Sequence, residues 1–417
     1  MRGRREGISL ADLRETGGSR ATRTAPGSAA DARMTTRRAG GSAQKPSRAS
    51  RGSAPREAVR ASPNPQGTTR SRERSPPAKR ARASRPRDPG AHPDDHPNHP
   101  RFWVAGGAGR VLARPMLDSS PSLDDPAALR AALRRDGYLL LRGVLPPRDV
   151  RRARRRCLDA LAASRPDCFH PDARRRREGI LAPDATRLSL LSRQDIATSP
   201  EVRAVVESNA LFDLVEALFD GARAMTTRFK WLRAVAGGEY TGPHADRVFL
   251  GRGCDRLVTA WIPLGVVRVE DGALLVARGS HANAAFTRVR ETYGASEVGE
   301  DGTRSGWLAD DAAAVAGMLG EGAEVDWRTT RFEPGDVAVL GIDTVHMSAS
   351  NASGEEGGDA RLRVSCDTRW QPAAAKADDR VREWRRRDDE GRVETVVVRD
   401  GGDEDEARKR GDVTIRD

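Results

Sequence analysis

The chain has 417 residues, and at ~100 to 200 residues per domain this length favours two or three domains. Its formal net charge of +12 belongs to the N-terminal part: residues 1–100 hold 22 Lys and Arg against 9 Asp and Glu, whereas residues 101–417 hold 50 against 51. The near-neutral charge of the second part argues against a core that binds nucleic acid. The sequence has no run of 18 apolar residues, the length that would predict a membrane span.

Residues 1–100 are predicted to be a disordered basic tail and linker. They contain no aromatic residue and only four Ile, Leu or Val, too little apolar surface to offset the entropy of ordering. Their Arg- and Ser-rich composition is typical of an organelle transit peptide, and Lys79 to Arg82 could be a nuclear import signal. A solvated extension with no specific role explains them equally well. The default expectation is an intracellular, cytoplasmic protein, because the four cysteines form no C-x-x-C pair or disulfide framework.

Helices dominate the first half of the remaining chain. Asp125-Pro126 supplies an N-cap and a proline at the first helical position, and Asp136-Gly137 ends that helix. A strand is predicted at 138–141, an amphipathic helix at 146–163, and a helical stretch from Ser199-Pro200 through Phe219.

Short strands rich in Thr, Val, Phe and Trp follow Gly221. Such strands, separated by Gly and Pro, predict a β-sandwich or barrel. The strand-like segments are 222–235, 244–250, 257–263, 273–277, 336–341, 344–349 and 361–370. Residues 374–417 are charged again and, apart from 393–398, offer little to bury. The predicted organisation is therefore a tail (1–100), a folded domain (101–373) and a charged C-terminal extension (374–417).

Two histidines and one aspartate occupy strand-like segments where a core should be apolar. In 244–248, strand alternation would place His244 and Asp246 on one face, so that both can point at the same atom. His346 follows the apolar strand 337–340 about 100 residues later. Two imidazoles and one carboxylate, with open positions beside them, are the ligand set of non-haem Fe(II) oxygenases.

The segment 361–370 alternates polar and apolar residues. Alternation places Arg363, Ser365, Asp367 and Arg369 on one face of a strand. If that face points inward, an arginine and a hydroxyl two residues apart are well placed to hold a carboxylate, such as the 5-carboxylate of 2-oxoglutarate. Arg369 could take this role instead, or Arg363 and Ser365 could form a structural salt bridge with Asp367 or a neighbouring strand. At ~3.3 Å per residue Arg369 lies some 20 Å from Arg363, so only one of the two can hold that group.

Seven motifs, in their order, resemble the phytanoyl-CoA dioxygenase family of Fe(II)- and 2-oxoglutarate-dependent oxygenases. The resemblance covers roughly residues 126–373. The motifs are DGYLLLRGVL, KWLRAV, HADRVFLGRG, TAWIPLG, DGALLVARGSH, PGDVAVLGIDTVHMS and RLRVSCDTRWQP. One departure from the family is a longer connection between His346 and Arg363, where residues 354–360 resemble an inserted surface loop.

The resemblance implies a mainly β fold with flanking helices around a double-stranded β-helix, or jelly roll. It implies that His244, Asp246 and His346 bind Fe(II), that Arg363 with Ser365 binds 2-oxoglutarate, and that Trp261 lines the cosubstrate pocket. Dioxygen would be the third component. No catalytic residue beyond the metal ligands is implied.

Other residues compete for these roles. His92-Pro93-Asp94 and His170-Pro171-Asp172 are further H-x-D triplets, but proline in the middle argues against a strand. His281 is a rival to His346, although it ends a glycine-bearing turn. Trp261 could equally be plain core. Lys230, Trp231 and Arg233 could reach an anionic substrate, or they could belong to a solvated edge strand.

The sequence therefore predicts an Fe(II)/2-oxoglutarate-dependent dioxygenase that hydroxylates a small or lipid-like organic substrate with release of succinate and CO2. A different class of function stays open, namely an inactive binding or regulatory protein on the same fold. A third class is an enzyme that hydroxylates macromolecules and recruits them through its basic tail. The sequence carries no signal for an oligomeric state.

Overall fold

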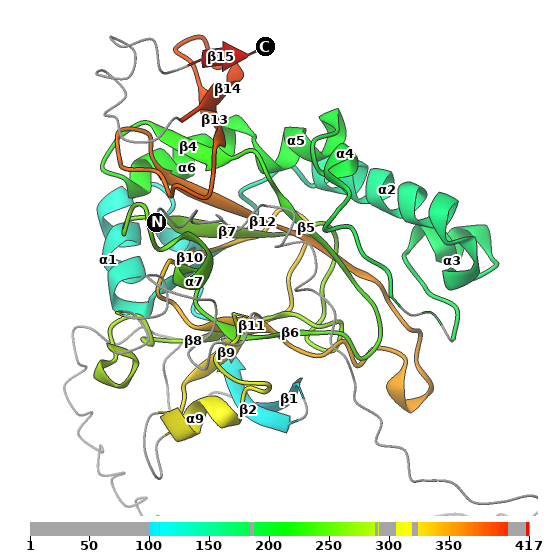
Figure 1. Cartoon of the computed structure of the whole chain (residues 1–417). Coiled ribbons are helices and arrows are strands. Elements are labelled where there is room, and N and C mark those ends of the chain that lie inside the picture. Colours follow the sequence, from blue (N-terminus) through cyan, green and yellow to red (C-terminus); the bar gives the residue numbers. More distant parts are fainter. Residues whose placement is uncertain are drawn as a thin grey trace, which may run out of the picture. The chain divides into compact units, whose positions relative to one another are not determined.

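The computed structural model describes residues 101–398, apart from 108, 184, 186, 288–290, 292–305 and 319–323, together with 414–416. These residues form two facing sheets with helices packed outside them, the jelly roll predicted from the sequence (Figure 1). The predicted disordered tail, residues 1–100, lies outside the described residues. Among the described helices, none is long and apolar enough to cross a membrane.

The smaller sheet has six strands in the order β1-β2-β9-β8-β11-β6. Its strands are β1 (Phe102–Gly106), β2 (Gly109–Pro115), β6 (Thr241–His244), β8 (Leu274–Ala277), β9 (Trp327–Thr329) and β11 (His346–Ser348).

The larger sheet has the order β15-β14-β13-β4-β12-β7-β10-β3, and β5 pairs with β12 beside this path. Its strands are β3 (Tyr138–Leu141), β4 (Ala224–Thr227), β5 (Trp231–Val235), β7 (Val258–Pro263), β10 (Val337–Gly341), β12 (Arg363–Pro372), β13 (Glu383–Arg387), β14 (Val393–Val397) and β15 (Thr414–Arg416).

The helices begin and end largely where the sequence signals predict. The Asp125 side chain accepts the Ala128 amide at the start of α1, and Gly137 ends that helix with a φ of 81°. The helices are α1 (Pro126–Asp136), α2 (Pro147–Ser164), α3 (Ala173–Arg177), α4 (Gln194–Ala197), α5 (Pro200–Val206), α6 (Asn209–Leu218), α7 (Arg247–Leu250) and α9 (Ala314–Met318).

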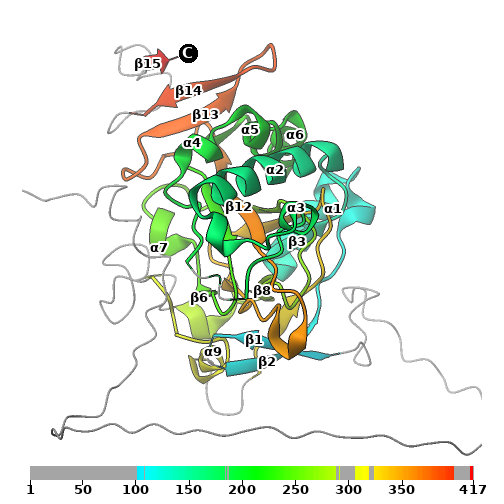
Figure 2. The ribbon, with the colours of Figure 1, turned by 90° about the vertical axis from the view of Figure 1, so that its right-hand side faces the viewer.

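The helices α1, α2, α5 and α6 cover the outer face of the larger sheet (Figures 1 and 2). Their apolar residues share one core with outward-facing strand residues such as Val339, Ala260 and Val364. A second apolar cluster, which includes Tyr138, Trp261 and Val276, combines residues of both sheets and therefore fills part of the space between them.

Three predictions of local structure were wrong. The strand-like segment 222–235 is two strands, β4 and β5. The helical stretch 199–219 is two helices, because Ser208 adopts an extended conformation and its hydroxyl accepts the Leu211 amide as the N-cap of α6. The segment 244–250 is not a continuous strand, because β6 ends at His244 and α7 begins at Arg247.

The charged C-terminal segment contributes more to the fold than its composition indicates. Strands β13 and β14 extend the larger sheet next to β4. Trp384 of β13 is fully buried, and Arg387 pairs with Asp213 and Glu216 of α6 at 2.7 Å each. Paired arginines thus hold this hairpin against the sheet, while the division at residue 373 stays a prediction.

Candidate metal centre and cosubstrate site

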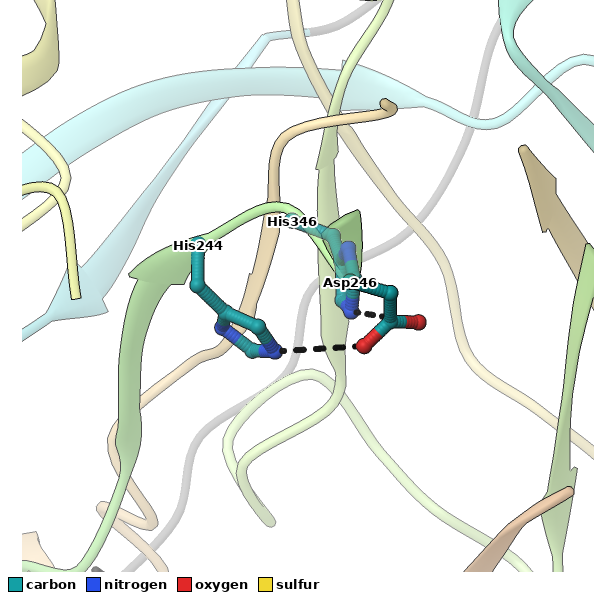
Figure 3. Close-up of side chains that lie close together, drawn as sticks. All are labelled: His244, Asp246 and His346. Carbon is teal, nitrogen blue, oxygen red and sulfur yellow. Dashed lines mark ion pairs between the residues drawn. The ribbon is translucent and has the colours of Figure 1, made fainter. Parts of the chain in front are cut away.

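The structure brings His244, Asp246 and His346 together between the two sheets. His244 and His346 are direct partners on the neighbouring strands β6 and β11, and Asp246 lies just beyond β6. The three side chains are buried and point toward one another, with donor atoms within 4.8 Å (Figure 3). The Nε2 atom of each histidine lies 3.9 Å from an oxygen of Asp246. This group could hold a metal ion.

Both imidazoles are oriented by backbone carbonyls. His244 Nδ1 lies 2.8 Å from the Gly242 carbonyl and His346 Nδ1 lies 2.9 Å from the Thr344 carbonyl. If Nδ1 carries the proton and donates to the carbonyl, Nε2 keeps its lone pair toward the centre, as a metal ligand requires. Burial, and then the neighbouring His346, lower the pKa of His244 to about 3, so this ring is neutral near pH 7.

Asp246 is held by two donors from the larger sheet. Thr259 of β7 donates to Oδ2, and Arg369 of β12 donates to Oδ1 at 2.9 Å. Burial alone would raise the pKa of Asp246, but Arg369 and the two imidazoles hold it below its usual range. The carboxylate is therefore charged and fixed in orientation. Thr259 was not predicted from the sequence, although its alternation with Trp261 on β7 places a hydroxyl on the inner face.

The pair His244 and Asp246 converges for a different reason than strand alternation. Asp246 has helical backbone angles (φ −65°, ψ −16°) and stands directly before α7. The chain therefore turns after His244, and this turn directs the carboxylate toward Nε2 of His244.

The competing histidines lie elsewhere. His281 Nε2 lies 2.8 Å from the Arg134 carbonyl, and this histidine is not part of the cluster. His170 Nδ1 accepts the Asp172 amide at 3.0 Å, and Asp172 is the N-cap of α3. The triplet at His92 lies outside the described residues.

The inner face of β12 is polar along its whole length. Arg363, Ser365, Asp367, Arg369 and Gln371 alternate with Val364, Cys366 and Trp370, which belong to the core under the helices. All of these side chains are buried. The polar face therefore points inward.

Arg363 lies at the start of β12, away from the metal cluster. Its Nη1 donates to the Gly272 carbonyl, which precedes β8, while its Nε is buried without a hydrogen-bond partner. Burial, and then Arg233, lower the pKa of Arg363 to about 10, which still leaves it charged near pH 7. Ser365 Oγ is likewise buried and unpartnered. These two neighbours on one face present unsatisfied donors.

Arg369 and Asp367 have other partners, although Nε and Nη1 of Arg369 and Oδ1 of Asp367 are also buried without a hydrogen bond. Arg369 contacts Asp246 and stacks over the Trp231 ring, with 4.6 Å from its guanidinium carbon to the ring centre. Asp367 accepts a hydrogen bond from Arg233 at 2.9 Å rather than from Arg363. The salt bridge weighed as an alternative for Arg363 is thus made by a different arginine. Residues 354–360, predicted as an inserted loop, lie mostly at the surface.

Trp261 and Lys230 lie in contrasting surroundings. Trp261 is on β7 opposite Asp367, and its ring packs on Phe332 with 4.7 Å between ring centres. Its role as a pocket residue stays a prediction. Lys230 is fully buried and pairs with Glu207 at 3.1 Å, on the outer side of the sheet that α5 covers, so it does not reach the site.

Comparison with known proteins identifies the family. The model of the family described as phytanoyl-CoA dioxygenase (PhyH) matches residues 133–356, more than half of the chain. The chain belongs to the phytanoyl-CoA dioxygenase family. It is therefore a 2-oxoglutarate-dependent non-haem iron oxygenase by family.

The individual proteins that are similar to this chain share less than a third of its sequence. The 1-deoxypentalenic acid 11-beta-hydroxylase of Streptomyces exfoliatus is 28% identical over 275 residues, which cover 62% of this chain and 86% of that protein.

Among solved structures, the carbocyclase SnoK from nogalamycin biosynthesis has a TM-score of 0.43 at 19% identity, covering 63% of this chain and 89% of SnoK. EctD from S. alaskensis with bound Fe has a TM-score of 0.41 at 18% identity, covering 65% of this chain and 84% of EctD.

Proposed function

We propose that this member of the phytanoyl-CoA dioxygenase family binds Fe(II), 2-oxoglutarate and dioxygen and hydroxylates a small, largely apolar organic molecule, releasing succinate and CO2. One observation carries the proposal: two imidazoles and one charged carboxylate converge in a buried space, each directed by its own hydrogen bonds. This donor set, which leaves open positions, suits non-haem Fe(II).

The residues fit a metal ion. Both Asp246 oxygens and the Nδ1 atoms of both histidines have their outer partners already in place, which is the usual arrangement around a metal ligand. The buried Asp246 carboxylate faces the Nε2 atoms of both imidazoles, an arrangement that suits a cation between them. In the proposal His244, Asp246 and His346 hold the iron, while Arg369 and Thr259 position Asp246.

The residues also fit 2-oxoglutarate. The unpartnered Nε of Arg363 and hydroxyl of Ser365 are buried polar atoms that the chain itself does not satisfy, and such atoms are rare in folded proteins. A carboxylate placed between them would accept charge-assisted hydrogen bonds from both. In the proposal these two residues hold the distal carboxylate, and Trp261 borders the same space from β7.

When bound, iron with 2-oxoglutarate and dioxygen supplies the oxidising chemistry, in which one oxygen atom enters the substrate and the other enters succinate. The protein's residues orient the reactants and exclude water. Asp246 is fully buried, and His244 and His346 are nearly so, which keeps the site dry. No side chain is needed as a proton donor in this assignment.

Hydroxylation is the favoured reaction because the relative from Streptomyces exfoliatus is named as a hydroxylase. An inactive binding protein on the same fold is less well supported, since all three metal-binding side chains are present and preoriented. Recruitment of macromolecules by the basic tail rests on residues outside the described part of the chain.

The decisive experiment is an anaerobic titration of the full-length protein with Fe(II) and then 2-oxoglutarate, followed by exposure to oxygen. We expect one iron per chain, 2-oxoglutarate binding that depends on iron, and succinate formation that a suitable metabolite extract stimulates. Absence of iron-dependent 2-oxoglutarate binding would contradict the proposal.

A further inference from the structure

Arg233 is a third arginine on the inner surface of the larger sheet. The register pairs it with Ser365 of β12, and its neighbours Leu232 and Ala234 face the opposite way, into the core under the helices. Among the described strands β5 pairs only with β12, so Arg233 stands at an edge of the sheet. It is therefore directed inward, next to the place where the sheet ends.

The Arg233 guanidinium is fixed at Nε, whereas its two terminal nitrogens remain available. Its Nε donates to Asp367 at 2.9 Å, and within the described residues its two terminal nitrogens make no hydrogen bond. Its side chain is 18% exposed, whereas Arg363 and Arg369 are about 1% exposed. Of these three inward-facing arginines, Arg233 is the one that something entering from solvent can reach.

Side-chain contacts connect Arg233 with both halves of the site. Its register partner is Ser365 of the candidate 2-oxoglutarate anchor. Asp367, which bonds Arg233, also lies 3.8 Å from Arg369, and Arg369 bonds Asp246 of the candidate metal centre.

The carboxylate that neutralises Arg233 is shared with a second arginine. Asp367 Oδ2 bonds Arg233 and also lies 3.8 Å from Arg369, while its Oδ1 has no partner. The carboxylate of Glu239 accepts the Ala236 amide and forms no ion pair with Arg233. Arg233 thus retains capacity for a second anion.

The surface near His244 is aromatic. Phe249 meets the His244 ring edge-on at 5.9 Å between centres, and Tyr240 lies 5.5 Å from Trp307. Trp307 packs so closely on β6 that a Cβ on Gly242 would approach its ring to 2.4 Å. These rings are only partly buried, and they offer an apolar wall beside the candidate metal centre.

We propose that Arg233 binds the carboxylate of the organic substrate, which is an apolar carboxylic acid whose hydrocarbon body packs on Phe249, Tyr240 and Trp307. This inference rests on the proposed function and specifies its substrate class. A guanidinium whose Nε is held by Asp367 presents its two terminal nitrogens as a preoriented fork, the geometry that carboxylates accept. Arg363 and Ser365 already serve 2-oxoglutarate in this assignment.

The test uses the full-length protein loaded anaerobically with Fe(II) and 2-oxoglutarate. Dodecanoic acid and cyclohexylacetic acid are titrated by calorimetry, each beside its methyl ester, which keeps the shape and removes the charge. We expect an acid to bind at least ~10-fold more tightly than its ester, and Arg233→Gln to weaken acid binding by ~10- to 100-fold while ester binding stays the same. The 2-oxoglutarate affinity should change by less than about 3-fold.

Three variants accompany Arg233→Gln. Arg233→Lys should recover part of the acid binding, because it keeps the charge. Arg233→Gln with Asp367→Asn avoids an unpaired buried carboxylate and should show the same acid-specific loss if the single variant folds poorly. Arg228→Gln is the control and should behave as wild type. Arg228 is exposed, lies two residues before Lys230, and pairs with Glu383.

Two outcomes overturn the inference: no acid binds better than its ester, or Arg233→Gln weakens 2-oxoglutarate instead of the acid. The second outcome would make Arg233 part of the cosubstrate site. If the wild-type protein fails to bind iron and 2-oxoglutarate in the loading step, the proposed function fails as well. An intact loading step with no preference for acids refutes only the substrate class.

Discussion

Strand β12 buries both of its faces, but the two faces hold opposite chemistry. On the outer face Val364, Cys366 and Trp370 pack under the helices, and the Trp370 ring meets Phe212 edge-on at 4.9 Å. On the inner face Arg363 and Ser365 are as deeply buried and retain unsatisfied polar atoms. Burial alone therefore does not distinguish a core from a site. On β12 the two faces differ in the unsatisfied polar atoms of the inner face, from which the fold itself gains nothing.

The largest effect is expected at the candidate metal centre, which this inner face borders. Asp246→Asn removes the charged ligand with little change in volume, and we expect iron affinity and succinate formation to fall by more than ~1,000-fold, beyond the ~10- to 100-fold typical of losing an outer partner. Metal analysis and succinate assays measure both effects.

Asp172→Asn is the matched control for this variant, because Asp172 belongs to the other described H-x-D triplet and only caps α3. Asparagine is an equally good N-cap, so stability should be unchanged. Normal iron content in the Asp246→Asn protein would refute the ligand assignment.

The next prediction tests the far end of the inner face. Arg363→Leu should raise the 2-oxoglutarate requirement by ~10- to 100-fold, because a charge-assisted hydrogen bond contributes roughly 1.5 to 3 kcal/mol. Iron affinity in the absence of 2-oxoglutarate should remain the same. Arg361→Leu is the control, since Arg361 lies before the strand and its nearest carboxylate is Asp359 at 3.6 Å. Equal effects of the two variants would contradict the assignment.

Arg369→Gln should have the reverse signature. Arg369 bonds Asp246 directly, so its loss should weaken iron binding by about 10-fold and affect 2-oxoglutarate only through the metal. Parallel titrations of iron alone and of 2-oxoglutarate at saturating iron separate the two effects. If Arg369→Gln alone produced the selective 2-oxoglutarate defect, the anchor would be at the wrong end of β12.

The sequence predicted the two faces of β12 because this strand is long and regular, so that alternation holds from Arg363 to Trp370. Alternation failed at His244 and Asp246, where the chain leaves the strand after one residue of the pair. Even so, the three residues singled out by their types lie close together in the structure. What the local pattern could not give was the contact of Asp246 with Thr259 and Arg369, because it depends on which strands face each other across the two sheets.

The C-terminal hairpin was missed for a related reason. Its charged composition predicts solvent exposure, but Arg385 pairs with Glu207 between α5 and α6, Arg387 pairs with carboxylates of α6, and Trp384 is buried. Partners distant in the sequence decide whether such a segment folds onto a sheet, and no local pattern contains them.

The smallest expected effects concern two adjacent residues, Ser365 and Cys366, which separate the two faces most sharply. Ser365→Ala removes a buried hydroxyl that has no partner, so the free energy of unfolding should stay the same or rise by about 1 kcal/mol, because burying an unsatisfied hydroxyl is costly. The same change should raise the 2-oxoglutarate requirement about 5-fold, the equivalent of roughly 1 kcal/mol for one hydrogen bond. Cys366→Ala removes one buried sulfur from the outer core and should lower the free energy of unfolding by about 1 kcal/mol with no effect on 2-oxoglutarate. Urea denaturation and 2-oxoglutarate titration of both variants give four values. The assignment of the two faces is wrong if a single variant shows both the lower free energy of unfolding and the weaker 2-oxoglutarate binding.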